Sequence, residues 1–211
     1  MNEPPEGATR TLSPRPRQVS DDDILQGALR TIVRKGPARM TLVDVGKEVG
    51  VSAAAIVQRF GSKRRLLLAI AAQGPEANRW IFEGLRTTHP SPIKALLALA
   101  DCMGQLGETP DEIANSLAFL QVDLTDAEFH RHALGSSTAI HDGIRGLVQD
   151  AQSSGQLVRT DASRLAWAVQ SAMNGSLLNW AIHRDGEVAA WIRRDLETVL
   201  RPYRSPRRGA R

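Results

Sequence analysis

The sequence predicts an all-α protein made of a small N-terminal unit of three helices and a larger C-terminal helical domain. Three observations support this prediction. Residues 41–63 contain two short amphipathic segments joined by a glycine turn. Through most of the remaining chain, apolar residues recur every three or four positions, the period of a helix with one buried face. No stretch competes convincingly as a strand or a β-hairpin.

The composition fits a globular protein with a substantial core. The chain has 211 residues, of which 42% are hydrophobic, and a single cysteine, Cys102. One cysteine excludes an internal disulfide framework and suits a reducing compartment. No segment has the continuous apolar length of a membrane span, and the first 20 residues lack the apolar core of a secretory signal. We therefore expect a cytoplasmic protein.

Charge is unevenly distributed along the chain. The formal net charge is +4, yet residues 20–66 alone carry +4 and residues 201–211 carry +5, so that residues 67–200 are acidic. A basic first third on an acidic body favours a DNA-contacting module attached to a domain that need not touch DNA. Local charge of this size is also common on other proteins, so the asymmetry alone does not decide the function.

The first expected helix runs from about Asp21 to Lys35. Ser20 is its predicted N-cap, and three aspartates in the first turn complement the positive end of the helix dipole. Gly36-Pro37 is expected to end it. Residues 1–19 contain four prolines and three arginines, a composition that predicts a disordered arm.

The stretch from Thr41 to Lys63 has the plan of a helix-turn-helix. Thr41 and Ser52 are predicted N-caps. Gly50 suits the position just after a helix end, because glycine adopts a positive φ there at little cost in free energy. The second helix turns Ile56 and Phe60 inward, which leaves its other face with nothing to pack on. Such a face is expected of a helix that enters the major groove, although two helices of an ordinary bundle are the alternative. This outer face consists of Ala53, Ala54, Val57 and Gln58.

The block from Ile24 to Leu67 resembles the N-terminal domain of the tetracycline-repressor (TetR) family of bacterial transcription regulators. The resemblance implies a DNA-binding domain at 20–66 and a helical effector-binding and dimerisation domain at 67–203. The arginine-rich composition of residues 204–211 predicts a basic tail. The matching residues follow in order without an insertion: a Lys-Gly pair after the first helix, then Thr41, Val45, Val49, Gly50, Val51, Ser52, Ile56, Phe60, Ser62, Lys63, Leu66 and Leu67.

The resemblance also implies how DNA is contacted. Of the residues expected to face the bases, only Gln58 can hydrogen-bond to a base edge, where glutamine suits adenine. Val57 stands where the family usually has a tyrosine, and it cannot donate to phosphate. Arg59 is a predicted substitute for that contact. The predicted DNA-binding residues are Arg39, Thr41, Ser52, Ala53, Ala54, Val57, Gln58, Arg59 and Lys63.

Helix signals continue through the rest of the chain. Ser91-Pro92, Thr109-Pro110 and Thr125 are predicted helix starts. Gly74-Pro75 is expected to break or kink the helix that begins after Ser62.

Two amphipathic helices, about Asp161–Arg184 and Glu187–Tyr203, resemble the family's dimerisation hairpin, which would form a four-helix bundle with a second copy. Closure of the monomer core is the alternative role. The predicted interface residues are Ala172, Gly175, Ser176, Val188, Ile192, Leu196 and Val199.

The resemblance further implies an apolar small-molecule pocket among the middle helices. The candidates are apolar or aromatic residues, with one or two polar groups, and each is also compatible with an ordinary core position. They are Trp80, Met103, Phe119, Leu120, His130, Trp167, Gln170 and Asn174.

Little in the sequence indicates catalysis. Cys102 has no histidine near it in the sequence, and His130 and His132 point to different sides of a helix. His130 and Asp126 share a face but are too few for a metal site. No glycine-rich phosphate loop or Ser-His-Asp signature is present. We expect no enzymatic activity, no metal and no cofactor.

These observations predict a dimeric, sequence-specific DNA-binding transcription regulator. A repressor that occupies a palindromic operator and is released by a small apolar effector is the favoured interpretation. One alternative is a ligand-independent, architectural DNA-binding protein. Another is an all-helical enzyme or sensor that has lost DNA binding.

Overall fold

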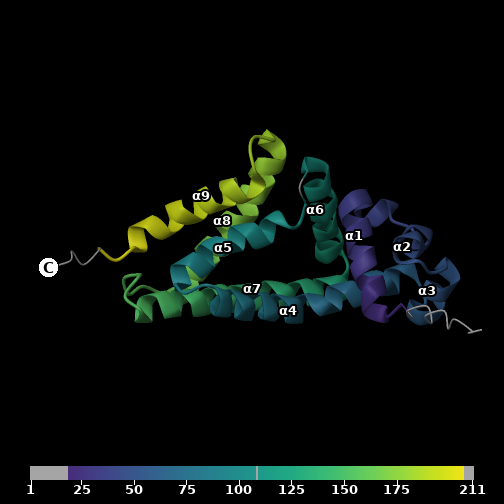
Figure 1. The fold of residues 1–211 in the computed structure, drawn as a ribbon, viewed down its shortest axis with the longest axis horizontal. Coiled ribbons are helices and arrows are strands. Elements are labelled where there is room, and N and C mark those ends of the chain that lie inside the picture. Colours follow the sequence, from purple (N-terminus) through teal and green to yellow (C-terminus); the bar gives the residue numbers. More distant parts are fainter. Residues whose placement is uncertain (1–18, 108, 207–211) are drawn as a thin grey trace, which may run out of the picture.

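A computed structural model describes residues 19–107 and 109–206, which form an elongated α-helical molecule (Figure 1). The only β-structure among these residues is an isolated bridge between Leu157 and Arg204. The predicted all-α fold is confirmed. None of the described helices is both long and apolar enough to cross a membrane. The helices are α1 (Asp21–Arg39), α2 (Leu42–Val49), α3 (Ala53–Phe60), α4 (Lys63–Thr88), α5 (Pro92–Gly104), α6 (Pro110–Thr125), α7 (Ala127–Ser153), α8 (Ala162–His183), α9 (Val188–Leu200) and the 3₁₀ helix η1 (Arg201–Tyr203).

Side-chain caps fix most of the helix starts. Ser20 and Thr41 each accept a hydrogen bond from the backbone N–H three residues on, and the aspartate at that position accepts one back from the cap. Thr109 forms the same reciprocal box with Glu112 at the start of α6. Such boxes satisfy two of the amide groups that a helix start leaves unpaired, and the starts predicted at these residues are confirmed.

Gly36 interrupts α1 near its C-terminal end. Its backbone angles, φ 77° and ψ 157°, are not helical, and the last turn after Pro37 takes a new direction. This confirms the predicted end of the regular helix at Gly36-Pro37. The short turn beyond it leads through Met40 into α2.

Of the break or kink expected at Gly74-Pro75, the break is wrong, because α4 continues through Pro75. The helix runs on to Thr88 because α4 packs closely along α7 at this point. An ideal Cβ on Gly74 would lie 2.4 Å from Oγ of Ser136, and one on Gly135 would lie 3.1 Å from Cγ of Pro75. Packing along α7 compensates for the backbone hydrogen bond that proline removes.

Two hydrophobic cores lie at opposite ends of the molecule. The N-terminal core joins α1, α2 and α3 to the start of α4 and includes Phe129 of α7. The larger C-terminal core joins α5, α8 and α9 to the distal parts of α4 and α7. The long helices α4 and α7 run side by side between the two ends, with α6 standing next to α1 (Figure 1). Since Leu67 and Ile70 belong to the N-terminal core, that core reaches beyond the predicted boundary at residue 66.

Candidate nucleic-acid interface and interior cleft

The segment from α2 to α3 is a tight helix-turn-helix. Gly50 ends α2 in the left-handed region, with φ 77° and ψ 29°, and Ser52 caps α3 by accepting a hydrogen bond from the N–H of Ala55 at 3.1 Å. Gly46 makes the turn possible, because an ideal Cβ there would lie 2.4 Å from the carbonyl oxygen of Val51. A larger residue at position 46 would push the two helices apart.

The outer face of α3 is free, as the sequence predicts. Ile56 is fully buried, whereas Ala54, Gln58 and Arg59 are exposed. Val57 leaves 45% of its surface exposed although it is apolar. Together with the half-buried Ala53, the residues Ala54, Val57 and Gln58 present a surface of small, apolar and amide side chains. Such a surface suits close approach to base edges in a major groove.

Several cations of this unit are already paired with its own carboxylates. Arg30 and Arg34 both contact Glu48, and Lys35 donates to Oδ1 of Asp44 at 2.6 Å. The hydrogen bond from Arg30 is the main reason that the pKa of Glu48 is lowered. The hydrogen bond from Lys35, followed by that from Thr41, lowers the pKa of Asp44 to about 2. Both carboxylates are therefore charged at neutral pH and hold α1 to α2.

Three side chains that are predicted to contact the DNA backbone form hydrogen bonds with protein groups in this structure. Arg39 donates to Oδ1 of Asn115 at 3.2 Å, and Lys63 donates to the carbonyl oxygen of Ala38 at 2.8 Å. Arg59 donates to the carbonyl oxygen of Val19 at 2.7 Å. These bonds position the start and end of α1, so a role of the same side chains at phosphate remains a prediction.

Two cations outside the set predicted from the sequence have free side chains in this unit. Lys47 of α2 and Arg65 of α4 are exposed, and neither side chain makes a hydrogen bond or ion pair within residues 19–107 and 109–206. Arg65 lies in the first turn of α4, beside Gly61. The feature of the sequence that could have identified Lys47 and Arg65 is their position on the polar face of an amphipathic helix.

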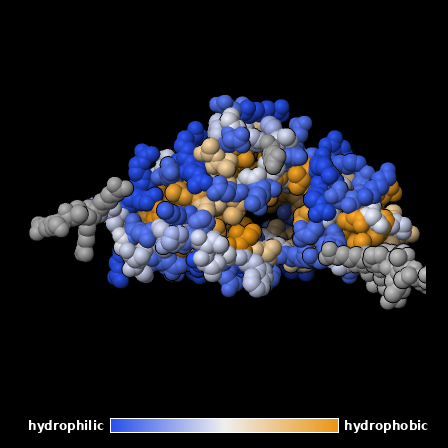
Figure 2. Space-filling view, viewed as in Figure 1, coloured by the Kyte–Doolittle hydropathy of each residue, from blue (hydrophilic) through white to orange (hydrophobic). Residues whose placement is uncertain are grey.

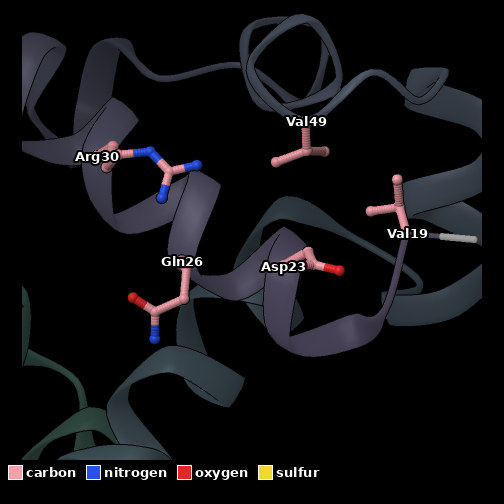
Figure 3. Close-up of a pocket in the computed structure, with 5 residues that line it drawn as sticks. All are labelled: Val19, Asp23, Gln26, Arg30 and Val49. Atoms are coloured by element: carbon pink, nitrogen blue, oxygen red, sulfur yellow. The ribbon is translucent and has the colours of Figure 1, made fainter. Parts of the chain in front are cut away.

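A shallow hollow of about 280 Å³ lies on the side of this unit, where Val19, Asp23, Gln26, Arg30 and Val49 surround it (Figure 3). Its charged groups already have protein partners, since Asp23 binds the Ser20 cap and Arg30 binds Glu48. Among the described residues, the hollow therefore offers no free charged group to a ligand.

A larger cleft of about 550 Å³ lies between the two ends of the molecule. It is within the range of roughly 300–1,000 Å³ that is typical of small-molecule sites. Its walls come from α1, α4, α6, α7 and α8, and the space-filling view shows hydrophobic residues beside a hollow in this middle region (Figure 2). The lining residues include Leu29, Ile32 and Val33 of α1, so the cleft reaches the DNA-binding unit directly.

The structure brings four of the eight predicted pocket residues to this cleft, namely Phe119, Leu120, Gln170 and Asn174. The other four lie elsewhere. Trp80 and Trp167 are more than half exposed, Met103 packs against the C-terminal core, and His130 is exposed. Trp167 instead stacks on His141, with ring centroids 4.3 Å apart.

The predicted interface residues of α9 need correction. Val188, Ile192 and Leu196 are buried in the chain's own C-terminal core, so they cannot meet a second copy. Ser176 is also buried and donates to Oδ2 of Asp195. Helical spacing identifies an apolar face but not the helix that covers it, and here α8 and α9 cover each other. Ala172, Gly175 and Val199 are only partly buried.

No group of three or more His, Cys, Asp or Glu side chains in the described part of the chain is arranged to hold a metal ion. Burial, followed by the nearby charge of Asp101, raises the pKa of the Cys102 thiol. A thiol that stays protonated is a poor nucleophile.

Comparison with known proteins agrees with this geometry. Residues 24–70 match the bacterial regulatory proteins of the tetR family. The HTH-type transcriptional regulator TtgR of Pseudomonas putida is 24% identical over 193 residues, which cover 86% of this chain and 92% of that protein.

Solved structures extend the similarity to the whole fold. A TetR transcription regulator from Haloarcula marismortui has a TM-score of 0.72 at 16% identity, covering 88% of this chain and 98% of its own. SmeT, the repressor of the Stenotrophomonas maltophilia multidrug efflux pump SmeDEF, has a TM-score of 0.64 at 19% identity, covering 90% and 93%. Fold and site define a helix-turn-helix transcriptional regulator. The sequence match to the tetR family of bacterial regulatory proteins covers the helix-turn-helix unit, and the similarity of fold to solved structures covers most of the rest of the chain.

Proposed function

We propose that this regulator is a homodimeric, cytoplasmic repressor that reads a palindromic operator with α3 and releases it when a small, mainly apolar effector enters the cleft. The observation that carries the proposal is that one cleft is lined both by the effector-domain helices α6, α7 and α8 and by α1 of the DNA-binding unit. A ligand in that cleft would touch the DNA-binding unit itself.

The proposed reading of DNA rests on the exposed face of α3. Gln58 offers hydrogen bonds to a base edge, and Val57 offers an apolar contact to a thymine methyl group. One α3 helix reads few base pairs, which is why the proposal requires two copies. The proposed phosphate contacts are two exposed N-caps and two exposed, unpaired cations, namely Thr41, Ser52, Lys47 and Arg65.

The proposed dimer surface is the outer face of α8. Trp167, Leu178 and Ile182 are 51%, 51% and 67% exposed although they are apolar. Their spacing places them on one stripe of the helix together with Gly175, where an added Cβ would meet nothing within 4 Å. An open glycine on an apolar stripe allows a partner helix to approach closely. The outer face of α9 carries charged residues, so α8 is the better candidate for the centre of a four-helix bundle.

The proposed signal passes through α6. Its middle lines the cleft through Phe119 and Leu120. Near its start, Asn115 donates to the carbonyl oxygen of Val33 at 3.0 Å and accepts from Arg39. At its end, Asp126 accepts hydrogen bonds from Arg64 of α4 at 2.8 and 3.0 Å. Movement of α6 around a bound effector would therefore displace α1 and α4 together. The effector must bind the released conformation more tightly than the DNA-binding conformation. A ligand with equal affinity for the two conformations would not shift the equilibrium between them.

Selection of bound fragments from a random duplex pool, at near-physiological salt, tests the DNA-binding part of the proposal. We expect a palindrome whose half-sites are about one helical turn apart, or a multiple of it. Recovery of no motif, with binding that disappears as salt rises, would leave only electrostatic attachment and would overturn the proposal.

With an operator in hand, a compound library can be screened for release by fluorescence anisotropy. Ala77→Trp should block that release because Ala77 lines the cleft. Ala72→Trp is the matched control, since Ala72 is an exposed residue of the same helix outside the cleft. Equal responses of the two variants would show that the effector binds elsewhere.

A further inference from the structure

The cleft has an unusual balance of polar groups. Most of its lining is apolar, and Asp123 of α6 is the only one of its lining residues in the described chain that carries a carboxyl group. No lysine, arginine or histidine is among these lining residues. A ligand inside the cleft would therefore meet one carboxylate and no protein cation.

Asp123 is not satisfied by the protein. Its carboxylate makes no hydrogen bond or ion pair with any residue of the described chain, although five other carboxylates of the same or neighbouring helices are paired with arginine or a cap. Burial raises the pKa of the Asp123 carboxyl above its usual value, and the nearby imidazole of His130 lowers it by a smaller amount. A partly buried carboxylate without a donor is destabilised as an anion, and a positive charge beside it would relieve that cost.

Gln170 of α8 adds a second acceptor. Only 7% of the residue is exposed, and its Nε2 faces Ser137, at 3.2 Å from Oγ and 3.4 Å from the carbonyl oxygen. Because a carbonyl oxygen can only accept, the amide nitrogen belongs on that side, which leaves Oε1. This Oε1 atom is buried and has no hydrogen-bond partner in the described chain. An unpaired buried acceptor is costly unless another group supplies a donor.

Two of the donor groups that line the cleft are occupied by the protein. Ser116 donates to the carbonyl oxygen of Leu106 at 2.8 Å, and the amide nitrogen of Gln170 is held by Ser137. An anionic ligand would meet Asp123 without a compensating cation, and a neutral hydrocarbon would leave both free acceptors unpaired.

Building on the effector role proposed above, we propose that the cleft selects lipophilic cations that carry N–H donors, such as protonated alkyl or aryl amines. The hydrocarbon part lies along the apolar walls from α1, α4 and α7. The ammonium group pairs with the Asp123 carboxylate and donates a hydrogen bond to Oε1 of Gln170. This ligand class supplies a partner both to the Asp123 carboxylate and to Oε1 of Gln170.

Isothermal titration calorimetry with four decyl compounds tests the proposal on the full chain, below their micelle-forming concentrations. Decylamine supplies charge and donors, decyltrimethylammonium supplies charge alone, decanol is neutral and decanoate is anionic. We expect decylamine to bind at least about tenfold more tightly than decanol, because hydrogen bonds to charged groups are worth about 1.4 kcal/mol or more. Decyltrimethylammonium should lie between them, and decanoate should bind most weakly.

Variants assign the preference to the two acceptors. Asp123→Asn should remove most of the preference for both cations while leaving decanol affinity unchanged, which also shows that the cleft is intact. Asp123→Glu should restore part of the preference. Gln170→Leu should weaken decylamine but not decyltrimethylammonium. Asp111→Asn is the matched control, since Asp111 is an exposed carboxylate of α6 outside the cleft.

Failure of this inference can be told apart from failure of the proposed function. Equal binding of all four compounds, or tightest binding of decanoate, would overturn the cation preference while leaving an effector cleft. A cation preference that survives Asp123→Asn would overturn the assignment to Asp123. Absence of binding by every compound would overturn both the cation inference and the effector role of this cleft.

Discussion

Oδ1 of Asn115 lies where a side chain on Gly36 would have to be. An ideal Cβ on Gly36 would come within 2.9 Å of that oxygen, and the same Asn115 donates to the carbonyl oxygen of Val33 at 3.0 Å. Asn115 thus contacts α1 on both sides of the point where the helix changes direction. The segment of α1 that leads into α2 is therefore in direct contact with the effector-domain helix α6.

The contact makes Gly36 a sensitive position. Gly36→Ala should lower the free energy of unfolding by about 1–3 kcal/mol, because φ 77° with ψ 157° is a region that residues with a Cβ rarely occupy. The displaced Asn115 side chain adds to that cost. Thermal unfolding should show a loss of several degrees in Tm.

Gly155→Ala provides the control for backbone strain. Gly155 also has a positive φ, 70°, but an added Cβ would meet nothing within 4 Å. We expect a smaller loss of stability than for Gly36→Ala. Equal losses in the two variants would mean that the contact with Asn115 contributes little.

Asn115→Ala should uncouple the effector from DNA. The variant removes both hydrogen bonds that join Asn115 of α6 to α1 while leaving the α3 surface untouched, so operator affinity should stay within a few fold. In typical allosteric proteins an effector changes the affinity for the second ligand by about 5–150-fold. We expect the effector to reduce operator affinity by a smaller factor in Asn115→Ala than in the unmodified protein. Anisotropy titrations with and without a saturating effector measure both quantities.

Asn78→Ala is the matched control for that experiment. Asn78 donates from its amide to the carbonyl oxygen of Ser136 at 3.4 Å, which joins α4 to α7 rather than α6 to α1. Its coupling should resemble that of the unmodified protein. A similar loss of coupling in both variants would indicate general loosening and would remove Asn115 from the signal path.

The sequence was most informative where structure is decided by neighbouring residues. The starts of α1, α2, α3 and α6 follow from the caps, which act on backbone groups within three residues. The change of direction at Gly36 and the turn at Gly50 follow from backbone conformations that glycine adopts readily. The inward position of Ile56 and the outward position of Val57 follow from helical spacing.

Features that depend on distant neighbours were less predictable. Helical spacing identified the apolar faces of α8 and α9 but not that Ile192 and Leu196 face the chain's own core. Pro75 continues α4 because α7 lies against it, a contact made with a helix that comes much later in the chain. Residue type and position along the chain selected Trp80 and Trp167 for the pocket, but neither lines the cleft. Part of the cleft wall comes from α1, which no local pattern linked to the middle helices.

The two kinds of proposed DNA contact should separate by mutation. Gln58→Ala should relax base preference at one position of each half-site, at a cost of about 1–3 kcal/mol for the preferred base. Lys47→Ala should weaken binding evenly across sequences and reduce the salt dependence by about one unit. Titrations on the selected operator and on single-base variants, at several salt concentrations, measure both effects. If the two variants gave the same pattern, the division between base and phosphate contacts would be wrong.

A charge on the outer face of α8 should prevent dimerisation. Ile182→Lys places an ammonium group in a proposed apolar interface, where its desolvation is costly. Sedimentation should then show a monomer at concentrations where the unmodified chain is a dimer. Leu124→Lys is the control, because Leu124 of α6 is equally exposed at 67% but lies outside the proposed interface. A dimer that persists in Ile182→Lys would exclude α8 as its centre.

The Lys35–Asp44 pair should be visible in the pH dependence of the DNA-binding unit. The pKa of Asp44 is lowered from 3.8 to about 2, first by the hydrogen bond from Lys35. A carboxyl whose pKa is lower in the folded than in the unfolded state contributes stability above the unfolded value, so this contribution should be lost as the pH falls from about 4 to about 2. Carbon NMR titration of the Asp44 carboxyl measures its pKa directly. Lys35→Met should raise that pKa towards 3.8, whereas Lys94→Met, which removes an exposed lysine of α5, should leave it unchanged. An Asp44 pKa that is the same in all three proteins would show that the Lys35 ammonium does not hold the start of α2 in solution.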